Sequence, residues 1–275
     1  MLTELLPDSP SKYPKFLKGV YSLPKAERKA ILRWLCRSDL YFLLRFVLST
    51  SKIVDKDGNC RWDHPWAFAR VREIQANPNG YIDIWAREHL KSSSITFGLS
   101  ILDILNDPEI TIGIFSHSRP IAKRFLRQIK TEFEDNKELV RLFPDILWAD
   151  PKTQSPKWSE DDGLRVKRKG NPAAETVEAW GLIDGQPTGK HFKLRVYDDV
   201  VDEDTVTTPE MISKVTKAWE LSSNLGMEGG WVRYIGTRYH CLSGESRILL
   251  SDWSHKPIMD IVPGDVVVGW VKENG

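Results

Sequence analysis

Two short segments of the chain combine residue types that could bind and hydrolyse a nucleoside triphosphate. Lys91 and Ser92 lie between a predicted strand and a predicted helix. A lysine at a helix N-terminus can bind the β- and γ-phosphates, the adjacent hydroxyl can bind Mg²⁺, and the backbone N–H groups there also favour phosphate. Asp198 and Asp199 follow a second predicted strand, where one acid could orient Mg²⁺ and the other could activate the attacking water.

Each segment also has a simpler interpretation. Trp85 and Leu90 replace the two glycines usual in a phosphate loop, so the first segment is compatible with a solvated turn. Asp198 and Asp199 are followed by more acids at residues 202–204, so the second segment is compatible with a solvated acidic turn. A parallel sheet would bring both strand ends to one edge, and this favours an ATPase that uses ATP and Mg²⁺.

The elements that would position these residues alternate between strands and helices from residue 81 onward. Short apolar runs predict strands, and apolar residues spaced by three or four predict helices. The alternation predicts an α/β fold with a mostly parallel sheet that is covered on both faces. The expected strands are residues 81–85, 110–115, 164–167, 176–180, 194–197 and 231–235, and the expected helices are residues 95–105, 120–129 and 209–219.

The chain on either side of this region follows other patterns. Apolar residues over 26–35 lie on one helical face, and a Ser-Asp cap predicts a second helix over 40–48. After His240, short β-like runs alternate with proline and glycine, which predicts a β-rich fragment. The expected parts are an N-terminal helical region at 1–60, an ATPase domain at 61–240 and a β-rich segment at 241–275.

Composition limits the function classes further. The 275 residues contain 39 basic and 38 acidic side chains, so DNA binding would need a local basic patch rather than bulk charge. No apolar run approaches the ~20 residues of a membrane span, and the N-terminus lacks the pattern of a secretory signal. Cys36, Cys60 and Cys241 show no C-x-x-C spacing, which argues against a zinc site or a disulfide framework. A reducing, cytoplasmic setting is expected.

Other polar and aromatic residues point to no firm site. Trp62, His64 and Gln75 lie where adenine contacts could fall, but they match no specific pattern. One predicted helix has a basic face, for which simple exposure to solvent is the better interpretation. This face consists of Arg124, Arg127 and Lys130.

Four motifs in order resemble the large terminase subunit of tailed bacteriophages, the ATP-driven motor that packages DNA into proheads. Residues 87–92 resemble the family's Arg-x-x-Gly-Lys-Ser/Thr loop, with Leu90 in place of Gly. Residues 176–181 and 188–192 are similar to the family's hairpin before the Walker B strand. Residues 197–201 resemble the family's Asp-Asp form of Walker B. Residues 235–240 resemble its Gly-Thr-Arg-Tyr/Phe-His coupling motif.

This resemblance implies a P-loop (ASCE-type) NTPase fold and a role for each matching residue. Ser92 and Asp198 would bind Mg²⁺, and Asp199 would act as the catalytic carboxylate. Arg87 would sense or stabilise the γ-phosphate. The implied ATP-binding residues are Arg87, Lys91, Ser92 and Ser93.

The resemblance also implies partners. Thr237 and Arg238 would couple hydrolysis to the movement of double-stranded DNA by a homo-oligomeric ring on the prohead. The portal protein and the small terminase subunit would be further partners, in the cytoplasm of the infected bacterial host. The family's C-terminal nuclease domain has no counterpart in this sequence, so we expect no DNA cleavage by this chain.

The segment that begins at Cys241 resembles the first block of an intein. The starting Cys precedes a short strand pattern and a Pro-Ile-x-Asp-Ile-x-x-Gly-Asp-x-Val run at residues 257–267. The resemblance implies a Hint-type β fold in which the Cys241 thiol attacks the carbonyl of His240 and forms a thioester. The later Thr-x-x-His and His-Asn blocks are absent. We therefore expect splicing only with a complementary C-terminal intein fragment, as a split intein or as part of a longer precursor.

Three other functions are compatible with the sequence. A loop without glycines fits a scaffold that has lost ATP and binds DNA or the portal. The strand-Lys-Ser pattern also fits a helicase-like P-loop NTPase. A β segment that starts with Cys fits an autoprocessing domain of hedgehog type, although the lack of a secretion signal argues against it.

Overall fold

The computed structural model describes residues 6–202, 205, 207–237, 247–252, 254–262 and 264–266. The chain divides into two compact units, Met1–Thr237 and Arg238–Gly275. The first unit contains a seven-stranded, mostly parallel sheet and several helices, which confirms the predicted α/β class. Within the described ranges, none of the helices is long and apolar enough to cross a lipid bilayer.

Five neighbouring strands of the sheet run parallel, so their carboxyl ends lie along one edge. The order is β1-β7-β6-β2-β5-β4-β3, and the pairs β5–β4 and β4–β3 are antiparallel. The strands are β1 (Ile82–Trp85), β2 (Ile112–Ser116), β3 (Trp158–Ser159), β4 (Gly163–Leu164), β5 (Val177–Gly181), β6 (Phe192–Asp198) and β7 (Gly226–Thr237).

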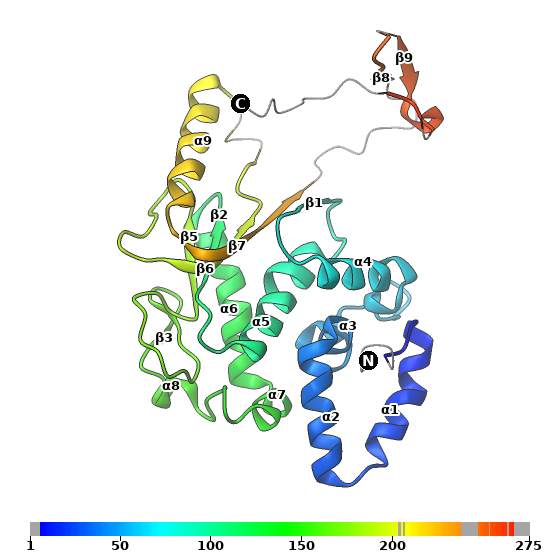
Figure 1. Ribbon diagram of the computed structural model, residues 1–275, viewed down its shortest axis with the longest axis vertical. Coiled ribbons are helices and arrows are strands. Elements are labelled where there is room, and N and C mark those ends of the chain that lie inside the picture. The colour runs from blue at the N-terminus through cyan, green and yellow to red at the C-terminus, as the bar shows by residue number, and fades with distance from the viewer. Residues whose placement is uncertain are drawn as a thin grey trace. The chain divides into compact units, whose positions relative to one another are not determined.

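Helices cover both faces of this sheet, and Figure 1 shows α6 (Arg119–Asp135) and α9 (Pro209–Ser223) on opposite sides of it. On one face, Ile114 and Val196 belong to the core that contains the apolar residues of α6. On the other face, Phe115 and Tyr197 pack with Val215 of α9. Consecutive residues of a strand point to opposite faces, so these two layers follow directly from the strand alternation.

The remaining helices of the first unit lie before, between and after the first strands. They are α1 (Tyr13–Tyr21), α2 (Lys25–Ser38), α3 (Leu40–Phe42), α4 (Pro65–Ala76), α5 (Ser100–Asn106), α7 (Lys137–Leu142) and α8 (Pro151–Gln154). The predicted cap at Asp39 is confirmed, because its carboxylate accepts from the Phe42 amide at 3.1 Å. The helix expected over 40–48 begins as α3 and continues as a π-helical turn, Leu43–Val47.

The expected hairpin before β6 is wrong. Residues 177–181 and 192–198 form β5 and β6, and both strands pair in parallel with β2, which lies between them. A hairpin joins antiparallel neighbours, whereas residues 182–191 here cross over β2. The strand expected over 164–167 is also shorter, since β4 ends at Leu164.

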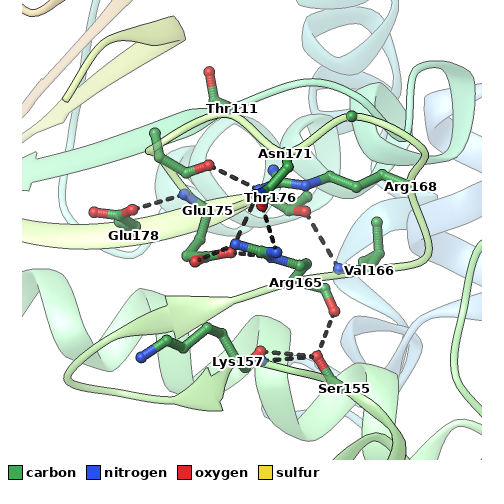
Figure 2. Close-up of polar contacts among 12 residues, drawn as sticks. Thr111, Ser155, Lys157, Arg165, Val166, Arg168, Asn171, Glu175, Thr176 and Glu178 are labelled. Carbon is green, nitrogen blue, oxygen red and sulfur yellow. Dashed lines mark hydrogen bonds and ion pairs between the residues drawn. The ribbon is translucent and has the colours of Figure 1, made fainter.

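A buried polar network holds the segment between β4 and β5. Arg165 makes two hydrogen bonds to the Glu175 carboxylate, at 2.6 and 2.8 Å, and a third to Asn171 at 3.0 Å. Figure 2 shows the contacts of Arg165 with these two partners, with Arg168 nearby. The Arg168 guanidinium lies 3.5 Å from Glu175, and its side chain is 1% exposed. One carboxylate therefore balances two guanidinium groups.

Replacing Glu175 with Ala should destabilise the first unit by about 3–5 kcal/mol, because two guanidinium groups would lose their shared counter-charge. Urea unfolding measures the loss. Glu138→Ala is a matched control, since Glu138 pairs with Arg141 at the surface and exposed pairs contribute little. Equal midpoints for the Glu175 and Glu138 variants would contradict a structural role of the buried network.

The second unit contains an antiparallel pair of short strands among its described residues. These are β8 (Arg247–Leu249) and β9 (His255–Pro257). Asp265, in the Gly-Asp motif, accepts from the Lys256 ammonium and from the Val262 amide, both at 2.8 Å. Its carboxylate therefore ties the turn after β9 to the strand. The β-like run expected from residue 266 continues into residues that lie outside the described part.

Candidate nucleotide site

The loop between β1 and the following helix turns at two residues with positive φ. Glu88 has a φ of 62° and Leu90 a φ of 64°. The Ser94 amide donates to the Leu90 carbonyl at 2.8 Å, so the helix begins directly after Leu90. The first amides of a helix have no acceptor within the helix and can bind anions. Leu90 thus has the left-handed backbone for which glycine is suited, at the place where glycine was expected.

Replacing Leu90 with Gly and with Ala should reverse the usual order of stability. In ordinary backbone, Ala is more stable than Gly by about 0.5–1 kcal/mol. At a φ of 64°, left-handed strain of roughly 1–2 kcal/mol affects Ala but not Gly. Both variants lose the same leucine packing, so we expect Leu90→Gly to unfold at the higher urea concentration. A higher midpoint for Leu90→Ala would contradict the left-handed loop.

Lys91, Asp199 and Thr237 meet at the carboxyl edge of the sheet. The Lys91 Nζ atom lies 2.7 and 2.9 Å from the two carboxylate oxygens of Asp199, and it also donates to the Thr237 hydroxyl. The Thr237 Oγ1 atom lies 2.8 Å from each of the same carboxylate oxygens. The three residues follow or end β1, β6 and β7, and they meet because β7 lies between the other two strands.

Asp198 is fully buried beside this cluster. It accepts hydrogen bonds from Ser92 Oγ at 3.1 Å and from Thr96 Oγ1. Burial raises the pKa of Asp198 to about 6. The charge of Asp199 acts in the same direction, and the two hydroxyls and Lys91 oppose it. Ser92 and Thr96 are four residues apart on the helix, so both hydroxyls face the same carboxylate.

The raised pKa of Asp198 predicts a pH-dependent stability. Between the ordinary value of 3.8 and about 6, the folded chain binds more protons than the unfolded chain, so stability falls as pH rises through this window. The full shift corresponds to about 3 kcal/mol. We expect Asp198→Asn to be more stable than the wild type above about pH 6, with the difference declining towards about pH 4. Unfolding in urea at a series of pH values measures this, and a difference that does not change with pH would contradict it.

The oxygen atoms of Ser92 and Asp198 fit a magnesium ion. Mg²⁺ in phosphate sites takes one or two protein oxygens and completes its shell with phosphate and water. The hydroxyl and the carboxylate lie 3.1 Å apart, at the start of the helix where phosphate would bind. Across the residues that the structure describes, no three His, Cys, Asp or Glu side chains gather to hold a metal ion. The donor set therefore suits a metal that arrives together with phosphate.

The structure describes two of the other expected site residues, Arg87 and Ser93. Arg87 is exposed on the loop, where its carbonyl lies 2.7 Å from His89 Nδ1. Ser93 belongs to the π-helical turn Ser93–Leu99. It lines a cavity of about 350 Å³ between this turn and α6. Outside the described residues lie Arg238, His240 and Cys241.

The residues considered for adenine contacts have structural roles. Trp62 is buried and donates to a backbone carbonyl at 3.0 Å. The His64 ring accepts from the Trp66 amide and caps α4. Gln75 bridges two backbone groups, one before α3 and one in its first turn. These contacts account for all three side chains without a ligand.

The basic face of α6 is largely paired with acids. Arg127 forms a bidentate ion pair with Glu160 at 2.6 and 2.8 Å, and Lys130 lies 2.8 Å from Glu134. Arg124 is exposed. These pairs reduce the net positive charge that the face presents, which agrees with its interpretation as an ordinary surface.

Sequence reasoning missed two residues at the site. Thr96 lies one turn after Ser92, and this spacing was the available indication. His117 directly follows β2, and its ring Nδ1 lies 3.2 Å from the Asp199 carbonyl. Since all parallel strands end at the same edge, the residue after β2 was also a candidate.

Comparison with known proteins supplies no relative for this site. No protein-family model matches the chain, and no curated protein matches it. The site itself combines a lysine at a helix N-terminus, two adjacent carboxylates and three hydroxyls. Such a set is typical of sites that bind phosphate together with Mg²⁺.

Proposed function

We propose that the first unit is a P-loop ATPase that serves as the ATPase part of a phage terminase large subunit. The observation that carries this proposal is the meeting of Lys91, Asp199 and Thr237. Lys91 is 108 residues from Asp199, and Asp199 is 38 residues from Thr237, along the chain. Three distant segments thus supply one buried cation, one carboxylate and one hydroxyl at the start of a helix, where phosphate is favoured.

Each residue has a task in this proposal. In the free protein, Lys91 is held by Asp199 and Thr237, and ATP would replace these contacts with its β- and γ-phosphate oxygens. Mg²⁺, when bound to Ser92 and Asp198, would neutralise charge on the phosphates. Asp199, once released from Lys91, would orient the attacking water and accept its proton. Arg87 would act on the γ-phosphate from the exposed loop.

The terminase assignment rests on the three motifs other than the hairpin, at residues 87–92, 197–201 and 235–240, and on their order. The contact between Lys91 and Thr237 supports it, because it joins the phosphate loop to the motif that would couple hydrolysis to movement. Under this assignment double-stranded DNA is the polymer that is moved. A homo-oligomeric ring, the portal protein and the small terminase subunit would be the partners, in the cytoplasm of the infected host.

Release of phosphate from ATP tests the proposed activity. We expect the full chain to release phosphate with Mg²⁺ but not with EDTA, and to do so faster with linear double-stranded DNA. No release under any of these conditions would overturn the ATPase and leave a scaffold that binds DNA or the portal. Unwinding of a forked duplex would indicate a helicase-like enzyme instead.

We also propose that the second unit is the N-terminal part of an intein. The antiparallel strands β8 and β9, and the contacts of Asp265 within the Pro-Gly-Asp motif, support a small β unit of its own. In this proposal the Cys241 thiol adds to the His240 carbonyl, the amide nitrogen leaves as the amine, and a thioester forms. A complementary fragment would complete the splicing.

Intact-mass measurement tests the intein proposal. The chain is mixed with a C-terminal intein fragment that carries the later Thr-x-x-His and His-Asn blocks. We expect a ligated product that lacks residues 241–275, and no product from Cys241→Ala. An unchanged mass for the wild type, or equal product from both chains, would overturn it.

A further inference from the structure

The backbone of Asp199 is held by a histidine from the neighbouring strand. His117 follows β2, and its amide lies 3.4 Å from the Asp199 carbonyl oxygen. Its ring Nδ1 lies 3.2 Å from the same oxygen. A carbonyl oxygen can only accept a hydrogen bond, so Nδ1 carries a proton and both groups of His117 donate to one acceptor.

Asp199 needs such support because its backbone is left-handed, with a φ of 46°. Aspartate adopts this conformation more readily than most residues, but it still costs energy. The conformation sets where the carboxylate points, which here is at Lys91 and Thr237. A return to negative φ would turn the side chain away from the phosphate loop. The donors that fix the carbonyl therefore also fix the direction of the carboxylate.

The far side of the imidazole is also occupied. The His117 Nε2 atom lies 3.5 Å from the Asp202 carboxylate. Asp202 in turn accepts from the Thr205 amide at 2.9 Å and donates its own amide to the Thr205 hydroxyl at 2.8 Å. The ring thus lies between the Asp199 carbonyl, which accepts from Nδ1, and the Asp202 carboxylate, which faces Nε2.

We propose that His117 is a positioning residue for ATP hydrolysis, which holds Asp199 in the conformation that aims its carboxylate at the reacting phosphate. The proposal rests on the proposed ATPase function and adds a role that the phosphate loop and the two acids do not supply. His117 acts through Asp199 and not on ATP. Its loss should therefore lower kcat without raising the KM for ATP, because an Asp199 carboxylate that is turned away from Lys91 competes less with phosphate.

Three substitutions separate the two ring contacts. In His117→Asn, the amide nitrogen is attached to Cγ, as Nδ1 is in histidine, so the donor to Asp199 is retained and the contact with Asp202 is lost. In His117→Gln, the amide nitrogen lies further out, near the place of Nε2, so Asp202 can be reached and the donor to Asp199 is lost. His117→Ala removes both contacts.

Steady-state phosphate release gives kcat and KM for the full chain and for each variant. We expect kcat to fall at least tenfold in the Ala and Gln variants and to stay within about threefold in the Asn variant, since small misplacements of a catalytic group cost large factors in rate. The KM for ATP should not rise in any of the three. Thermal unfolding of each variant identifies any that is not folded.

The results distinguish failure of this role from failure of the proposed function. If the wild type is no faster than Lys91→Ala, both the ATPase and the role of His117 are overturned. If the wild type is active and the folded Asn and Gln variants have equal kcat, only the role of His117 is overturned. A rise in KM without a fall in kcat would also overturn it, because it would place His117 in ATP binding.

Discussion

Replacing Asp199 with Asn should abolish most ATP hydrolysis while it tightens ATP binding. Asn has nearly the same shape but cannot accept the proton of the attacking water, and loss of a general base costs about 10²- to 10⁴-fold in rate. In the free protein the Asp199 carboxylate competes with phosphate for Lys91, at 2.7 and 2.9 Å. An uncharged amide competes less, so the dissociation constant for ATP should fall.

Two measurements on Asp199→Asn check the predicted combination of slower hydrolysis and tighter binding. Phosphate release gives kcat, and titration with a non-hydrolysable ATP analogue gives the dissociation constant. Asp161→Asn is the matched control, because Asp161 is an exposed partner of Lys123 on α6. Unchanged kcat in Asp199→Asn would contradict its catalytic role, and weaker binding would contradict the competition for Lys91.

Replacing Lys91 with Ala should abolish both binding and turnover. In the proposed function Lys91 is the cation that would bind phosphate, and its removal leaves Asp198 and Asp199 adjacent without a counter-charge. The carboxylates would then repel the phosphates. We expect turnover to fall by at least about 10²- to 10³-fold, as for loss of one charge-stabilising donor, together with loss of measurable ATP binding.

A surface lysine provides the control for this variant. Lys214 is exposed on α9, and Lys214→Ala removes the same charge from the chain. Phosphate release and analogue binding should match the wild type in Lys214→Ala and be lost in Lys91→Ala. Equal activity in the two variants would show that any ATPase activity arises elsewhere.

The sequence was sufficient to predict much of the fold. Short apolar runs at residues 110–115 and 194–197 were interpreted as strands, and they correspond to β2 and β6 within about two residues at each end. Such runs fit the buried strands of a parallel sheet, which are covered on both faces. The order of the strands was not predictable, because pairing depends on contacts between distant segments. The mistaken hairpin before β6 has this cause.

The candidate site was also predicted only in part. The rule that parallel strands end at one edge placed Lys91 near the Asp-Asp pair, and the structure brings them together. It is Asp199 that contacts Lys91, while Asp198 is buried against Ser92. Which of two adjacent acids points inward depends on the backbone, and Asp199 has a positive φ that no residue pattern indicated.

Leu90 illustrates how a departure from a motif can be misleading. Its side chain suggested that the loop had lost the geometry for phosphate, since glycine usually occurs there. The structure retains a left-handed backbone at this position with a leucine in it. The conformation is strained for leucine but not forbidden, so a left-handed backbone at this position does not require glycine.

The most direct test of the central claim is calorimetric titration of the full chain with a non-hydrolysable ATP analogue and Mg²⁺. The titration contains no DNA, portal protein or intein fragment, so it tests the cluster of Lys91, Asp199 and Thr237 in the chain by itself. The account predicts binding of one analogue per chain, lost in Lys91→Ala and tightened in Asp199→Asn. No binding by the wild type, or equal binding by Lys91→Ala, would contradict a nucleotide site at this edge of the sheet.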